Sequence, residues 1–105
     1  MNSYRDVVQS EINRVAARIR ELEDQSEAHS ETRAQIAKKI ARIEGASSSG
    51  DTNPQNCHKI LSHLRIEDEQ TVEAERLVKH HLKERKKQLD ILVEEIEALQ
   101  DSSLA

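Results

Sequence analysis

The five histidines and the single cysteine of this 105-residue chain are its best candidates for binding a metal ion. His63 with Glu67 and His80 with Glu84 are four residues apart, which places both members of a pair on one side of a helix. Such pairs arise often by chance in a chain so rich in Glu. Cys57 and the histidines near it lack the spacing that would bring them together on a helix. We therefore expect no metal site and no cofactor.

Nucleophilic catalysis needs a base, a group that orients it and an enclosed pocket for the developing charge. Leu, Ile and Val supply 24 residues, and the chain has one Tyr, no Phe and no Trp. This is too little apolar material to enclose a deep pocket. The composition predicts that the chain is not an enzyme and takes no small-molecule substrate.

Two glycines and one proline leave long stretches without a helix breaker, which favours extended helices in a single domain over residues 1–105. The breakers and three serines gather in residues 45–54, of which residues 45–53 are predicted to be a loop. Ser3 with Asp6 fits the start of a first helix over about 4–44, closed by Gly45. Asn53 and Pro54 fit the start of a second helix over about 54–100.

Apolar residues follow a heptad pattern in both predicted helices, with alternating steps of three and four residues. In the first helix the pattern places Val8, Ile12, Val15, Ile19, Leu22, Ile36, Ile40 and Ile43 on one seam. In the second it places Cys57, Leu61, Leu64, Val78, Leu82, Arg85, Leu89, Leu92, Ile96 and Leu99 there. The predicted fold is all-α: an elongated antiparallel two-helix hairpin of the coiled-coil type.

Each seam has a polar interruption, and folding the chain back at the loop brings the two interruptions to the same height. The interruptions are Ser26, His29 and Arg33 in the first helix and Asp68, Thr71 and Glu75 in the second. Polar groups facing one another can form hydrogen bonds, whereas a polar group facing Leu would lose hydration without compensation. This match favours the hairpin over a parallel homodimer. A break in the first helix near residues 23–33, giving three helices, is a further alternative.

His29 is the one histidine on the predicted seam, near Asp68 or Glu75 across the hairpin. A histidine there could switch the hairpin with pH. The simpler interpretation, which we prefer, is a hydrogen-bonded polar layer that fixes the register of the two helices.

The second helix has more apolar residues than one partner helix can cover. The surplus predicted to contact another protein consists of Ile60, Val72, Leu77, Ile91 and Val93. A partner helix, or a second hairpin completing a four-helix bundle, would cover them. The alternative is scattered exposed apolar residues, which any protein surface carries.

Charge is banded along the chain although the net charge is only −4. Acidic residues gather at 21–31 and 67–75, and basic residues gather at 14–20 and 76–87. A staggered second copy or a charged partner could set a basic band against an acidic one. The segment Arg76–Lys87 is a weaker candidate for binding nucleic acid. No aromatic residue lies within it and acidic stretches flank it, so we do not expect it to bind nucleic acid.

The longest apolar run is Ile91–Val93, too short for a membrane span, and the sequence begins without a hydrophobic stretch behind a basic start. A single cysteine favours a reducing, cytoplasmic location. Export by a route that needs no signal sequence is compatible with the same residues. The sequence thus predicts a protein–protein interaction module: an adaptor, assembly subunit or small chaperone that binds a partner helix or itself. A purely structural self-assembling coiled coil is the alternative.

Overall fold

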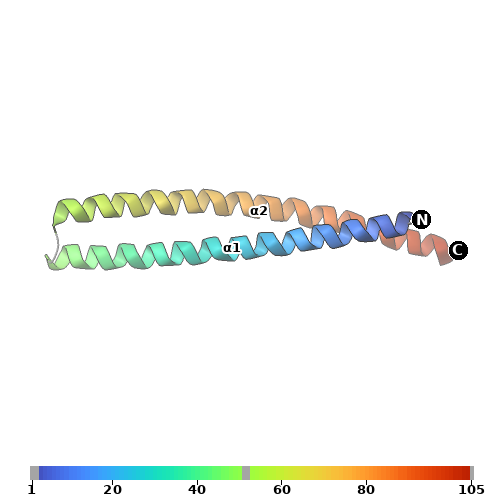
Figure 1. The fold of residues 1–105 in the computed structure, drawn as a ribbon, viewed down its shortest axis with the longest axis horizontal. Coiled ribbons are helices and arrows are strands. Elements are labelled where there is room, and N and C mark those ends of the chain that lie inside the picture. The colour runs from blue at the N-terminus through green and yellow to red at the C-terminus, as the bar shows by residue number, and fades with distance from the viewer. Residues whose placement is uncertain (1–2, 51–52, 105) are drawn as a thin grey trace. The chain divides into compact units, whose positions relative to one another are not determined.

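The computed structural model describes residues 3–50 and 53–104 of the chain. Two helices account for nearly all of this part: α1 spans Tyr4–Ser49 and α2 spans Pro54–Leu104. No strand occurs within the described residues. The fold is therefore the all-α antiparallel helical hairpin expected from the heptad pattern, and Figure 1 shows the two helices on either side of one connection.

The start of α1 is capped by side chains, as predicted. The backbone N–H of Asp6 donates to Ser3 Oγ at 3.2 Å, and the backbone N–H of Ser3 donates to Asp6 Oδ2 at 3.4 Å. These reciprocal bonds form a capping box, which satisfies N–H groups that have no partner within the helix.

The end of α1 differs from the prediction: the helix continues past Gly45 to Ser49. Only Gly50 among the described residues has a positive φ, of 75°, so Gly50 takes the left-handed conformation expected at Gly45. Ala46 extends the seam beyond Ile43, and both residues line a groove with Cys57. The interior Gly45 costs this helix about 1 kcal/mol.

Helix α2 begins at the predicted Asn53–Pro54 pair, where Asn53 Oδ1 accepts a hydrogen bond of 2.9 Å from the backbone N–H of Gln55. The helix runs to Leu104 rather than ending near residue 100. No glycine or proline follows residue 100 to stop it.

The packing of the two helices divides into two units. Unit 1 comprises Met1–Asp24 with Val78–Ala105, and unit 2 comprises Gln25–Leu77. Helix α1 is continuous through residues 23–33, so the structure contains no third helix in the described residues. Each unit is described by itself below.

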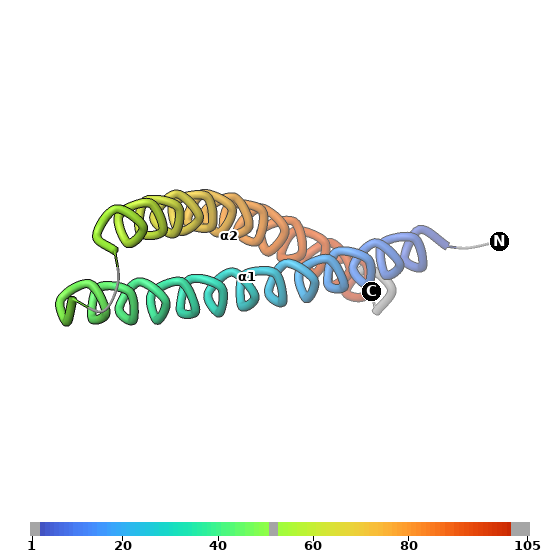
Figure 2. Tube along the Cα trace, turned by 60° about the vertical axis from the view of Figure 1, so that its left-hand side comes forward, coloured from blue at the N-terminus to red at the C-terminus, as the bar shows by residue number. Residues whose placement is uncertain are grey.

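In unit 1 the start of α1 and the C-terminal part of α2 lie side by side in opposite directions (Figure 2). Its buried core consists of Val8, Val15, Ile19, Leu22, Val78 and Ile96. Five further seam residues are half-buried: Ile12, Leu82, Leu89, Leu92 and Leu99. Leu22 is the best buried, at 1% exposure, and burying such a side chain contributes about 1.5–3 kcal/mol.

In unit 2 the rest of α1 returns through the connection into the first part of α2. Its buried apolar residues are Ile36, Cys57 and Leu64, and Ile40 and Leu61 are half-buried. Glu75 is also buried, so this unit combines a thin apolar core with a charged layer.

Candidate interaction surfaces

The centre of unit 2 is a charged layer built by Arg33 of α1 and two acidic residues of α2. Arg33 Nε donates to Asp68 Oδ1 at 3.3 Å. Arg33 Nη1 lies 3.8 Å from Glu75 Oε2. The three side chains come from the two polar interruptions of the seam, so within this unit the interruptions do meet.

Burial is unequal among these three residues. The side chain of Glu75 is 12% exposed, whereas that of Arg33 is 44% exposed. A buried carboxylate without a nearby cation costs several kcal/mol, so Arg33 compensates for the burial of Glu75. With 44% of its side chain exposed, Arg33 reaches the layer while remaining partly in water. Such an arrangement can fix the register of two helices and offers no obvious chemistry.

The other members of the predicted polar layer have different surroundings. Ser26, His29 and Thr71 are half-buried. The hydroxyl of Thr71 donates to the backbone oxygen of Glu67 at 2.9 Å, so it is satisfied within its own helix.

All five residues predicted for partner contact are exposed. Their exposed fractions range from 36% for Val93 to 64% for Ile91. Ile60, Val72 and Leu77 belong to unit 2, while Ile91 and Val93 belong to unit 1. The hairpin seam therefore leaves this apolar surface of α2 uncovered.

Helical geometry does not place these residues on one stripe. At 3.6 residues per turn, Ile91 and Val93 point about 160° apart, to nearly opposite sides of α2. In unit 2, Leu77 shares a side of α2 with Ile66, because about three full turns separate them. Ile66 is 53% exposed and was missed from sequence because it lies outside the heptad pattern among charged residues.

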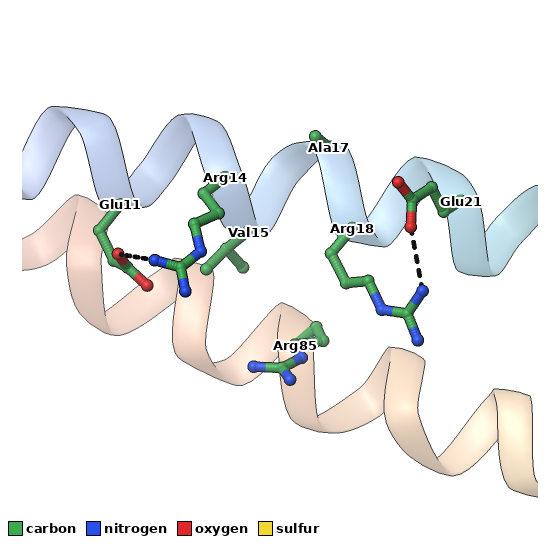
Figure 3. Close-up of a pocket in the computed structure, with 7 residues that line it drawn as sticks. All are labelled: Glu11, Arg14, Val15, Ala17, Arg18, Glu21 and Arg85. Carbon is green, nitrogen blue, oxygen red and sulfur yellow. Dashed lines mark hydrogen bonds and ion pairs between the residues drawn. The ribbon is translucent and has the colours of Figure 1, made fainter.

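Three arginines surround a groove of about 380 Å³ in unit 1 (Figure 3). Arg14 and Arg18 come from α1, and Arg85 comes from α2. Glu11 pairs with Arg14 at 3.5 Å, and Glu21 pairs with Arg18 at 3.0 Å. Two of the three cations are thus already neutralised, and this groove is a weak candidate for an anion site.

A second groove of unit 1 follows the basic stretch of α2. Its volume is about 460 Å³, and its lining consists of Lys79, Leu82, Lys83, Lys86, Lys87 and Asp90. Four ammonium groups around one half-buried leucine give a surface suited to carboxylates that flank an apolar side chain.

Two contacts perturb ionisation at the surface. In unit 2 the guanidinium of Arg76 donates to Glu73, with Nε 3.1 Å from Oε2, and this hydrogen bond lowers the pKa of Glu73. In unit 1 the hydroxyl of Tyr4 donates to Glu95, which raises the pKa of Tyr4. The contact between Tyr4 and Glu95 was missed from sequence because neither residue lies on the seam.

The histidine pairs considered above remain isolated pairs. Within residues 3–50 and 53–104, no group of three or more His, Cys, Asp or Glu residues is placed to hold a metal ion. His80 and His81 contact each other edge to face, with ring centroids 5.8 Å apart. In the same part of the chain, neither helix has a stretch apolar enough to cross a membrane.

Comparison with known proteins returned no matching family model, no matching curated protein and no matching solved structure.

Proposed function

We propose that this chain is a non-enzymatic protein–protein interaction module that contacts a partner helix, or a second copy of itself, through α2. One observation carries the proposal: the large apolar residues of α2 stay exposed after the seam has been buried. Their exposure costs hydration free energy, and a partner that covers them recovers it.

The grooves of the two units support a binding role over a catalytic one. Each is open and lined by long, exposed charged side chains or by the apolar end of the seam. An adaptor, an assembly subunit or a small chaperone would use such surfaces. A cytoplasmic location accords with a sequence that contains one cysteine.

The test combines light scattering with crosslinking in lysate of the native host. A double variant, Leu77→Glu with Ile91→Glu, places charge on both units of α2. We expect it to lose the wild-type association or crosslinks while its circular dichroism stays helical. The matched control is Val7→Glu, which changes an exposed residue of α1 and should leave association unchanged.

If the double variant associates as the wild type does, the proposed contact surface is wrong. Equal losses in the variant and in the Val7→Glu control would also contradict it, because the effect would then not be specific to α2.

A further inference from the structure

The basic groove of unit 1 has cations without carboxylate partners. Within the described part of the chain, no ion pair joins Lys83, Lys86 or Lys87 to a carboxylate. Leu82 is half-buried between these lysines. A complementary ligand would therefore present several carboxylates around one small apolar side chain.

The chain itself contains a segment with this chemistry, at residues 67–75 in unit 2. This segment has five acidic residues and no basic one. Arg33 and Arg76 pair with three of the five, which leaves Glu67 and Glu69 exposed. Val72 lies three residues after Glu69, on the same side of the helix, and is 40% exposed.

The spacing of the two segments also matches. Glu69 precedes Val72 by three residues, and Lys86 follows Lys83 by three residues. If two helices run antiparallel with Val72 at the level of Leu82 and Lys83, Glu69 comes to the level of Lys86. The apolar and the charged contacts can then form together.

We propose that the basic groove of unit 1 binds the 67–75 segment of a second copy of this chain, with Val72 against Leu82. The inference rests on the proposed function and names its partner. Each copy carries one groove and one segment, so two copies can exchange both contacts and close a dimer. Because its charged contacts are exposed, the association is weak and sensitive to salt.

Charge reversal tests the pairing directly. The groove variant is Lys83→Glu with Lys86→Glu, and the segment variant is Glu69→Lys with Glu73→Lys, two positions one turn apart on the same side of α2. Each variant alone brings like charges together at both contacts. We expect sedimentation to show self-association at least about tenfold weaker than that of the wild type, with mass near the 12.0 kDa of one chain.

An equimolar mixture of the two variants is the decisive measurement. Both contacts of the mixed dimer again join opposite charges, so we expect its affinity to return close to that of the wild type. The matched control is Lys38→Glu with Lys39→Glu, which makes the same change in net charge at exposed positions of α1 and should keep the wild-type association.

The inference is overturned if the variants associate normally, if the control weakens equally, or if mixing fails to restore binding. A wild-type chain that stays monomeric at every concentration also overturns it, while lysate crosslinks on α2 would still support the proposed function. Binding of duplex DNA that is lost in the groove variant, without self-association, would assign the groove to nucleic acid instead.

Discussion

At the scale of single residues, the least replaceable side chain of unit 2 is Arg33. It is the cation within reach of two carboxylates, Asp68 at 3.3 Å and Glu75 at 3.8 Å. Removing it takes a cation away from the buried Glu75, while Asp68 stays closer to water. The cost of losing Arg33 therefore arises mainly from Glu75.

We expect Arg33→Met to lower the free energy of unfolding by about 1–3 kcal/mol, the range for removing a partner of a buried polar group. Adding Glu75→Leu should recover most of this loss, because replacing both partners of a buried pair by apolar groups is often neutral or stabilising. Urea unfolding followed by circular dichroism, at one fixed protein concentration, measures both variants.

Arg42→Met is the matched control for this prediction, since Arg42 is an exposed arginine of α1 in the same unit. It should change stability by less than about 0.5 kcal/mol. A loss equal to that of Arg33→Met would show that the Arg33 effect is not due to Glu75. A double variant no more stable than Arg33→Met would contradict the same mechanism.

The layer was predictable from sequence only in outline. Two polar gaps at matching heights on two seams predicted that polar residues would face one another. The pattern did not show that Arg33 alone would reach two acidic residues, because that depends on the length and conformation of one side chain. Nor did it show that Thr71 would bond within its own helix.

At the scale of helices and their connection, two glycines near the end of α1 have different backbone conformations. Gly45 lies inside α1 with an ordinary helical backbone, whereas Gly50 has a φ of 75° after the end of α1. A Cβ added at either position would meet nothing within 4 Å. Backbone conformation, not space, therefore decides the effect of substitution.

Gly45→Ala should raise the free energy of unfolding by about 0.5–1 kcal/mol, because alanine loses less backbone entropy than glycine in a helix. Gly50→Ala should lower it by about 1–2 kcal/mol, because a side chain strains the left-handed conformation. Thermal unfolding of the two variants and the wild type shows whether each substitution raises or lowers stability. Stabilisation by Gly50→Ala and destabilisation by Gly45→Ala would place the end of α1 at Gly45 after all.

The heptad pattern was sufficient to predict both helices, because apolar residues at alternating steps of three and four match the repeat of an α-helix and not that of a strand. The end of α1 was misplaced because Gly, Ala and Ser suggest a loop by composition alone. The helix continues to Ser49, and its added turn carries Ala46, which lines a groove together with Cys57. A single domain over the whole chain stays a prediction, and the boundary between the two units falls next to the polar interruptions.

At the scale of the whole molecule, net charge and charge distribution predict opposite responses to salt. A net charge of −4 on each copy repels a second copy, and added salt screens this repulsion. Residues 79–87 carry five basic residues and one acidic residue, whereas residues 67–75 carry five acidic residues alone. If the basic groove binds the 67–75 segment, added salt screens this attraction instead.

We expect the local attraction to dominate, because contacting charges lie well within the Debye length of about 8 Å at physiological salt, while most other charges of two copies lie beyond it. Raising salt from about 0.05 M to 0.5 M should then weaken wild-type self-association by about tenfold. Sedimentation at several salt concentrations measures this, and circular dichroism shows whether the helices persist. In the Lys83→Glu, Lys86→Glu variant, self-association should instead strengthen as the salt concentration rises, because salt then screens only repulsion between the copies. Wild-type association that strengthens with salt would mean that apolar contacts hold the copies together against their net charge.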